Sequence, residues 1–281
     1  MRKLLQGQIW VLYVGLLFAA ASTFAATPFK YTFTVVPQFN PSQLHQEWTP
    51  VLQRISRETG IVLELKLVST FSLFEEELKK GSADFAYVNP YHVVMSKSAQ
   101  GYMPILRDST PIFGILLTRR DSPFKTAHDL NEQTIAFPAA NAFAASLYMR
   151  ALLAEQIGIR FSTRYLSTHS NVFRHLARNE VAAAGSVSSA FNDELPELRE
   201  QLQIIYKTPE VASHPLVVHP RVSAAVRDAI KQAFLDLSKD EAGRALLKEI
   251  RFPNPVLANY AKDYQPLEAL KLQKYFVTES R

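Results

Sequence analysis

The sequence predicts an α/β protein with two lobes, each built on a mostly parallel sheet flanked by helices. Short segments rich in β-branched and aromatic residues alternate with segments in which apolar residues recur every three or four positions. This β-α-β-α-β order is typical of parallel sheets. It occurs twice, between residues 31 and 99 and again between 134 and 187. A chain of 281 residues is long enough to bury two such cores.

The first 25 residues are expected to be a cleaved export signal and not part of the fold. Arg2 and Lys3 form a basic start, and residues 9–21 are mostly apolar but short for a membrane span. Thr23-Phe24-Ala25 supplies the small residues that a signal peptidase requires. An uncleaved anchor is the alternative interpretation. We expect a mature periplasmic protein that begins near Ala26.

The composition excludes several classes of protein. The chain contains no cysteine, so disulfides, thiolate catalysis and cysteine-ligated metals are ruled out. The formal charge of +5 falls to +3 without Arg2 and Lys3, and the charges form no basic stripe, so no nucleic-acid partner is expected. The seven histidines lack a metal-ligand spacing that includes a carboxylate. We therefore expect no metal and no other cofactor.

In the first half of the chain, Ser42 is the expected N-cap of the first helix, while Gly60 and Gly81 are expected to end helices. The expected elements are a strand at 31–36, a helix up to Gly60, a strand at 61–68, a helix at 72–80, a strand at 84–88, a helix at 90–99, and strands at 102–106 and 113–118.

The second half repeats the alternation on a smaller scale. The expected elements are a strand at 134–137, a long helix at 141–157, a strand at 164–166, a helix at 171–178, strands at 181–187, 204–206 and 216–218, and helices at 223–238 and 240–249. The last forty residues are expected to be helical.

The chain is expected to cross between the lobes twice, near residues 119–122 and again near 209–217. This places residues 26–120 and 211–281 in lobe 1 and residues 121–210 in lobe 2. Two crossings form a hinge and leave a cleft between the lobes.

Polar residues gather where the third predicted strand ends. Tyr87, Asn89, Tyr91 and His92 lie at or just beyond its carboxyl end. Ligands of α/β sheets bind at this end of the strands. We therefore interpret these four residues as candidates for ligand binding from lobe 1. The alternative is a structural role, in which Tyr and His satisfy their polar tips locally.

The turn before the long helix of lobe 2 is a candidate anion site. Asn141 is a suitable N-cap, which would leave the backbone amides of Ala142, Phe143 and Ala144 pointing forward. Helix N-termini bind anions through such amides and the helix dipole. The alternative is that Asn141 only caps the helix. His169 lies between a strand and a helix, where a donor or protonated imidazole would suit an oxyanion, although it could also be a capping residue.

Several phrases in this order resemble the periplasmic solute-binding proteins of phosphonate, phosphate and phosphite ABC transporters, the PhnD-like branch of the type II periplasmic binding protein fold. The phrases are Trp48-Thr49-Pro50, Lys80–His92, Asp121–Thr126 followed by Asp129-Leu130, Thr134–Pro138, Asn141–Ser146 and Ser167–Asn171. The resemblance implies hinge closure on a small anionic ligand, delivery to an inner-membrane ABC permease, no catalysis and a monomer.

The resemblance also implies roles for individual residues. In phosphonate-binding relatives, a Ser/Thr run at the turn holds the phosphonate oxygens, whereas here only Ser146 remains of that run. A histidine at the place of His169 contacts the anion, and a nearby hydroxyl, here Ser170, assists it. The matching places at 169–171 and 186–189 contain no carboxylate, which argues against an amine-bearing ligand. Phosphate, phosphite or a phosphonate is therefore the expected class of ligand.

Two other functions use the same lobes. A ligand-sensing protein would present the closed form to a membrane sensor kinase, and a transferase could occur on the same fold. The chain shows no Ser–His–Asp order, no paired carboxylates and no glycine-rich phosphate loop. We therefore predict a binding protein and not an enzyme.

Overall fold

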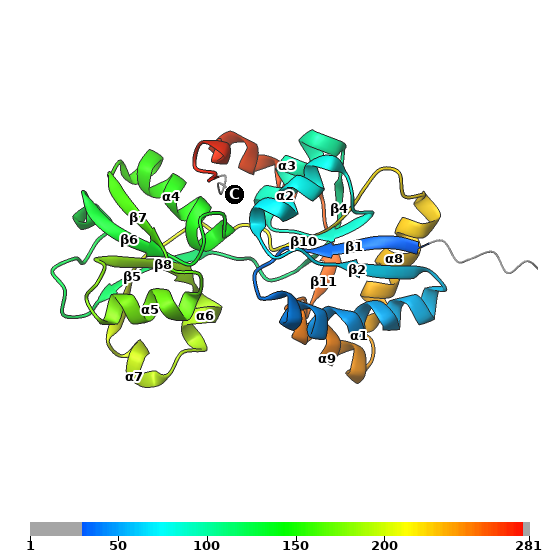
Figure 1. Cartoon of the computed structure of the whole chain (residues 1–281), viewed down its shortest axis with the longest axis horizontal. Helices are drawn as coiled ribbons and strands as arrows, with labels where there is room; N and C mark the ends of the chain where they lie inside the picture. Colours follow the sequence, from blue (N-terminus) through cyan, green and yellow to red (C-terminus); the bar gives the residue numbers. More distant parts are fainter. Residues whose placement is uncertain (1–29, 278–281) are drawn as a thin grey trace, which may run out of the picture.

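In a computed structural model, which describes residues 30–277, the chain folds into two α/β lobes side by side (Figure 1). The expected export signal, residues 1–25, lies outside the described residues. Each lobe contains one sheet covered by helices on both faces.

The sheet of lobe 1 has the strand order β11-β4-β10-β3-β1-β2. Its strands are β1 (Lys30–Val35), β2 (Val62–Lys66), β3 (Phe85–Tyr87), β4 (Met103–Asp108), β10 (Pro215–Val218) and β11 (Pro255–Leu257). Its helices are α1 (Pro41–Thr59), α2 (Phe71–Lys80), α3 (Pro90–Gln100), α8 (Ala224–Leu237), α9 (Glu241–Glu249), α10 (Tyr260–Asp263), and the short 3₁₀ turns η4 (Gln265–Leu270) and η5 (Leu272–Lys274).

The sheet of lobe 2 has the order β7-β6-β8-β5-β9. Its strands are β5 (Gly114–Arg119), β6 (Gln133–Phe137), β7 (Phe161–Tyr165), β8 (Ala183–Val187) and β9 (Leu202–Lys207). Its helices are η1 (His128–Leu130), the continuous run η2 (Phe143–Leu147), α4 (Tyr148–Leu152) and η3 (Leu153–Ile157), then α5 (His169–Ala177), α6 (Ser188–Asn192) and α7 (Pro196–Arg199). The continuous run is called the long helix below; its first and last turns are π-helical.

The predicted two-lobed α/β fold is confirmed, but both sheets are mixed and not mostly parallel. In lobe 1, β1 pairs in parallel with β2 and β3, and β10 enters antiparallel beside β3. Lobe 2 repeats this pattern, with β6 parallel to β7 and β8 and with β5 antiparallel to β8. Of the antiparallel strands, β5 and β10 enter directly from a crossing, without the helix that a parallel connection needs, whereas β11 follows α9 at the edge of the lobe 1 sheet.

The first crossing lies earlier in the chain than the sequence predicted. β5 pairs with β8 and β9, so residues 114–119 belong to the sheet of lobe 2 and not to lobe 1. The chain therefore leaves lobe 1 after Asp108. It returns between β9 and β10, within the predicted range. The two crossing segments pair with each other through Ile112 and Val211, whose amide-to-carbonyl distances are 2.9 and 3.0 Å.

Several local predictions need correction. The N-cap of α1 is Asn40 and not Ser42, because the Asn40 side chain accepts a hydrogen bond from the Gln43 amide. The last forty residues were expected to be helical, but they include the strand β11. The short helices α6 and α7 were not predicted, because each spans only one turn and carries no helical period. Gly60 and Gly81 end their helices as predicted, both with positive φ.

The alternation of side chains along β5 explains how lobe 2 is covered on both faces. Ile115 and Leu117 pack in the cluster beneath α5, whereas Leu116 packs with Met149 and Leu153 of the long helix. Successive residues of a strand point to opposite faces of a sheet. α5 and the long helix therefore lie on opposite faces of this sheet.

Two glycines allow the long helix to approach the sheet closely. A Cβ atom at Gly114 would lie 2.1 Å from the carbonyl oxygen of Ala144, and one at Gly185 would lie 2.5 Å from that of Ala145. No side chain larger than hydrogen fits at either position without moving the backbone of the helix. The first turn of the long helix is thus seated on β5 and β8 by backbone contact.

We predict that Gly114→Ala destabilises the protein by roughly 2–3 kcal/mol, because the helix must move away from β5. The measurement is the free energy of unfolding in urea. Gly158→Ala is the matched control: its φ is +77°, but no atom lies within 4 Å of the added Cβ. The control should cost only the strain of a left-handed residue, about 1 kcal/mol. Equal losses in the two variants would show that the close contact is unimportant.

Candidate functional site

The parallel strands of each lobe deliver helix N-termini to one edge of the sheet. In lobe 1, helices α1, α2 and α3 follow β1, β2 and β3, which run in the same direction. In lobe 2, the long helix, α5 and α6 follow β6, β7 and β8, which also run in the same direction. The carboxyl edge of such strands is where ligands bind in open α/β sheets.

The helix N-termini of lobe 1 are closed by side chains. Asn40, Thr70 and Asn89 cap α1, α2 and α3, each accepting a hydrogen bond from an amide three residues further along. Lobe 2 differs, because only α5 is capped in this way, by Thr168. The long helix and α6 follow Ala142 and Val187, which offer no side-chain acceptor.

The first turn of the long helix presents free backbone amides. Its N-cap is Ala142, and the first amides bonded within the run are those of Ser146 and Leu147, both to the carbonyl oxygen of Ala142. Among residues 30–277, no group accepts a hydrogen bond from the amides of Phe143, Ala144 and Ala145, although all three residues are buried. Buried amides without partners are costly, so this turn is suited to an external acceptor.

Asn141 does not cap the helix, which corrects the prediction. Its Nδ2 donates to the carbonyl oxygen of Val277 at 2.9 Å, and its Oδ1 accepts from the Val277 amide at 3.1 Å. Both polar atoms of this buried side chain are therefore used by the C-terminal segment. Ser146 is also engaged, because its Oγ accepts a hydrogen bond from Arg150 Nε at 3.2 Å. Ser146 is thus a helix-interior residue, and its hydroxyl does not add to the group of free amides in the first turn.

Arg150 is a buried cation beside this turn that the sequence analysis did not single out. Its side chain points back along the helix, and Nη2 donates to the carbonyl oxygen of Ala140 at 2.8 Å. Among the described residues no carboxylate pairs with it, and burial lowers the pKa of the guanidinium. The available signal was an arginine within an apolar stretch of the predicted helix, between Met149 and Ala151. Its charge adds to the positive end of the long helix.

His169 is the first residue of α5 and lies at the same edge of the sheet. Its Nδ1 is 2.7 Å from Ser186 Oγ, at the end of β8. Burial lowers the pKa of His169 to about 4, so the ring is neutral at pH 7. Without a ligand, the His169 ring therefore offers a neutral imidazole near neutral pH. If Nδ1 accepts the Ser186 hydroxyl, Nε2 carries the proton and is the donor that can meet an acceptor.

Ser170 points to a carboxylate that the sequence analysis did not place. Its Oγ donates to Glu194 Oε1, from the segment between α6 and α7. Glu194 lies outside the positions at which the resemblance places a carboxylate. The Ser170 hydroxyl is thus already committed to a protein acceptor.

His169 and the first turn of the long helix come together only at the edge of the sheet. Ser186 faces α5, whereas its neighbour Gly185 faces the long helix. The two groups therefore lie on opposite faces, and both begin at the carboxyl ends of neighbouring strands. A ligand that touches both must lie across that edge, between the lobes.

Two of the lobe 1 candidates lie within the core. Tyr87 stacks among Trp48, His214 and Phe252, with ring centroids 4.9 to 5.9 Å apart, and burial raises its pKa. His92 is fully buried, and its Nε2 lies 3.1 Å from Glu75 Oε1. These contacts favour the structural alternative for both residues, because each side chain already packs against or bonds to groups of the protein.

Asn89 and Tyr91 remain at the edge of lobe 1. Asn89 Oδ1 accepts from the His92 amide at 2.9 Å, while its buried Nδ2 has no partner among the described residues. Tyr91 is half-buried, and burial, followed by the charge of Glu75, raises its pKa. Its ring lies 5.9 Å from that of Phe276. Asn89 thus keeps a free donor near the N-terminus of α3.

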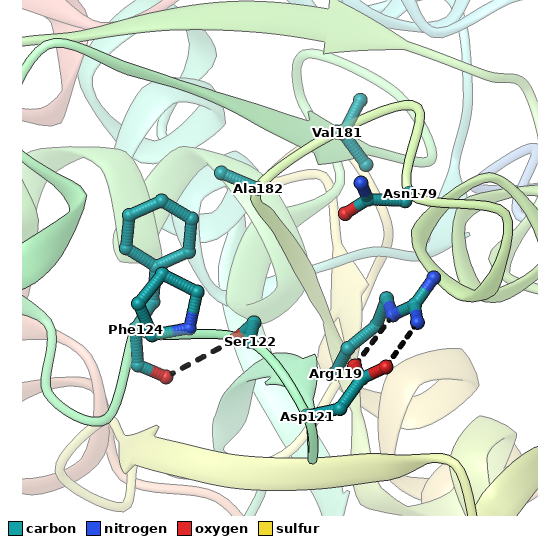
Figure 2. A pocket seen from close by; sticks show the side chains of 8 residues that line it. Arg119, Asp121, Ser122, Phe124, Asn179, Val181 and Ala182 are labelled. Carbon is teal, nitrogen blue, oxygen red and sulfur yellow. Dashed lines mark hydrogen bonds and ion pairs between the residues drawn. The ribbon is translucent and has the colours of Figure 1, made fainter.

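A separate hollow of about 180 Å³ lies at the other end of the lobe 2 sheet, where β5 ends and β8 begins (Figure 2). Figure 2 shows Arg119 bonded to Asp121 through two contacts, and Arg119 also donates to the carbonyl oxygen of Ala177 at 3.0 Å. Its guanidinium is therefore neutralised within the protein. Arg119 is therefore not available to bind an anion at this hollow.

Within residues 30–277, no group of three or more His, Asp or Glu side chains is arranged to hold a metal ion. Among the helices of that same range, none combines the length and apolar character needed to cross a membrane.

The chain forms two lobes joined by paired crossings, and an uncapped helix begins at the carboxyl edge of the lobe 2 sheet. This is the architecture of a two-lobed solute-binding protein. The family model for the periplasmic substrate-binding protein of phosphonate ABC transporters matches residues 33–264. The chain belongs to this family. The predicted family is thus confirmed, and the family consists of transporter components and not enzymes.

Individual relatives are distant. The phosphonates-binding periplasmic protein of Escherichia coli K12 is 20% identical over 269 residues, which cover 86% of this chain and 76% of the relative. PhnD1 from Prochlorococcus marinus, solved with methylphosphonate, is 12% identical, with a TM-score of 0.75 over 87% of this chain and 98% of that one. A Xanthomonas citri protein solved with chloride is 17% identical, with a TM-score of 0.76 over 88% and 98%. At these identities the solved structures establish the fold alone.

We predict that His169→Gln makes stability less dependent on pH. The unfolded histidine takes up a proton near pH 6.5, whereas the folded one does so only near pH 4. The unfolded state therefore binds more protons between these values, and wild-type stability falls as the pH falls from about 6.5 to 4. From pH 7 to pH 5 this histidine should account for roughly 2 kcal/mol.

The measurement is urea unfolding at both pH values. His214, whose pKa burial lowers to about 3, contributes equally in wild type and variant, so the difference isolates His169. His128→Gln, at an exposed position of the same lobe, should follow the wild-type curve. A His169→Gln protein with unchanged pH dependence would show that the ring is not buried as described.

Proposed function

We propose that this protein binds a small oxyanion, of the phosphate, phosphite or phosphonate class, between its lobes. The amides of Phe143, Ala144 and Ala145 donate hydrogen bonds to the anion, and neutral His169 donates a further one through Nε2. The observation that carries the proposal is the uncapped turn, where three buried residues leave their amides without an acceptor. These amides carry no formal charge, and Arg150 supplies positive potential beside them.

The N–H donor that His169 can offer through Nε2 favours an oxyanion over a cationic ligand. A ring that stays unprotonated down to about pH 4 can offer one N–H donor and no charge. Lobe 1 adds the unpaired Nδ2 of Asn89, also a donor. A ligand at this edge therefore meets donors from both lobes. This is the arrangement that oxyanions require, since all their oxygens are acceptors.

Delivery to a permease follows from the hinge. A ligand that contacts both edges binds the closed form more tightly and shifts the population toward it. A transporter's permease can then distinguish loaded from empty protein by shape. We further propose that residues 1–25 are a cleaved export signal, that the mature protein works in the periplasm as a monomer, and that it binds no nucleic acid.

The test is a thermal-shift panel of phosphate, phosphite, methylphosphonate and sulfate. A ligand at one hundred times its dissociation constant should stabilise the protein by about 2.7 kcal/mol. His169→Ala should weaken binding of the best anion by roughly 10- to 100-fold, the loss of one hydrogen bond to a charged group. His128→Ala, an exposed histidine of the same lobe, should bind like the wild type.

The outcomes separate the function from the site. If none of the four anions raises the melting temperature, the proposed class of ligand is wrong. If one of them binds equally well to wild type and His169→Ala, the ligand class stands and the assignment of His169 fails.

A further inference from the structure

We propose that the C-terminal segment 272–277 is a clasp that holds the two lobes together in the closed arrangement. This segment follows η4 of lobe 1, and Figure 1 shows it in red between α4 of lobe 2 and α2 and α3 of lobe 1. The inference concerns the opening of the lobes and does not depend on which ligand is bound.

The clasp is anchored to lobe 1 by apolar contacts. Leu272 is 1% exposed and belongs to the apolar cluster that contains the core of lobe 1 and also residues of the long helix of lobe 2. The ring of Phe276 lies 5.9 Å from that of Tyr91, and Lys79 Nζ lies 5.5 Å from the centre of the Phe276 ring. Phe276 therefore packs on α2 and α3.

The neighbours of Phe276 bind lobe 2 instead. Val277 forms two backbone hydrogen bonds with the Asn141 side chain, at 2.9 and 3.1 Å. The carbonyl oxygen of Tyr275 accepts from Arg150 Nη2 at 2.6 Å. The Tyr275 hydroxyl donates to Glu155 Oε1 at 2.5 Å, and Lys274 Nζ lies 3.2 Å from the same oxygen. The segment 272–277, taken as a whole, thus contacts both lobes.

The composition of these contacts suits a link that breaks and re-forms. Three of the hydrogen bonds use backbone groups of the segment. They therefore depend on where its backbone lies and not on the identity of its side chains. Arg150 is buried, its acceptors among the described residues are carbonyl and hydroxyl oxygens, and burial lowers the pKa of its guanidinium. Opening would expose the guanidinium to water, and its hydration would offset part of the free energy lost with these hydrogen bonds.

The clasp adds a third link to a hinge that has two. The crossings 109–113 and 208–214 connect the sheets and are joined by the bridge between Ile112 and Val211. Phe143, Leu147 and Tyr148 of the long helix belong to the same apolar cluster as the lobe 1 core, so the lobes already touch. Separation about the crossings must break the contacts of the clasp. The clasp therefore sets the ratio of open to closed molecules.

The experiment measures that ratio in ligand-free protein. Because the chain has no cysteine, Glu64→Cys and Ser162→Cys accept one spin label each, at exposed positions on the edge strands β2 and β7. Double electron–electron resonance then gives the distribution of distances between the lobes. Deletion of residues 275–281 should raise the open-to-closed ratio at least tenfold, which corresponds to ~1.4 kcal/mol.

A point variant and its control test the same contact without shortening the chain. Tyr275→Phe removes one hydrogen bond between the lobes and should raise the ratio about threefold. Tyr260→Phe removes a hydroxyl bonded to Glu268 at 2.5 Å, the same chemistry within lobe 1, and should leave the ratio unchanged.

The inference is overturned if the deletion leaves the distances as they are in the full chain, or if Tyr260→Phe opens the lobes as much as Tyr275→Phe does. Should the shortened chain fail to fold, as judged by its melting curve, Tyr275→Phe and Glu155→Ala decide. Glu155 is an exposed helix residue, so its replacement by alanine spares the core. Because no ligand is added, these results stand apart from those of the thermal-shift panel.

Discussion

The close contact between the long helix and the sheet of lobe 2 is the constraint on which the candidate site depends. Gly114 and Gly185 let the carbonyl oxygens of Ala144 and Ala145 approach β5 and β8 to distances that any side chain would forbid. This contact fixes the first turn of the helix at the carboxyl edge of β6. With Ala142 at the N-cap, the amides of that turn remain open to a ligand. A side-chain cap, as in all three helices at the edge of lobe 1, would have closed them.

The electrostatics of the site come from partial charges and one buried cation. His169 stays neutral because burial disfavours the imidazolium. Arg150 stays close to the turn because carbonyl and hydroxyl oxygens hold it there. Such a site attracts an anion without placing a full charge in direct contact with it. This is compatible with release, since a ligand held by amides and a neutral ring loses less on leaving than one held by an ion pair.

Arg150 and Asn141 also join the site to the movement of the lobes. Both side chains lie beside the turn that would meet the ligand, and both bind the backbone of the C-terminal segment. The edge that we propose for the anion is thus also the edge to which the proposed clasp is attached. In these proposals the ligand uses the backbone amides of the turn, whereas the C-terminal segment uses the side chains of Asn141 and Arg150.

The sequence by itself determined the α/β class, the two lobes, most element positions and the family. Those properties depend on local periods of apolar residues and on short phrases, which are visible along the chain. It also indicated His169 and the turn at 141–144 as candidates, because both follow strands. The tertiary structure decided the rest. Tyr87 packs against Trp48, and His92 bonds to Glu75. Both partners lie on other helices, so the burial of these two side chains depends on how the elements pack. Asn141 binds Val277, 136 residues away, and β5 joins the second sheet through pairings with β8 and β9. Contacts over such separations depend on how the elements pack, and no local pattern encodes them.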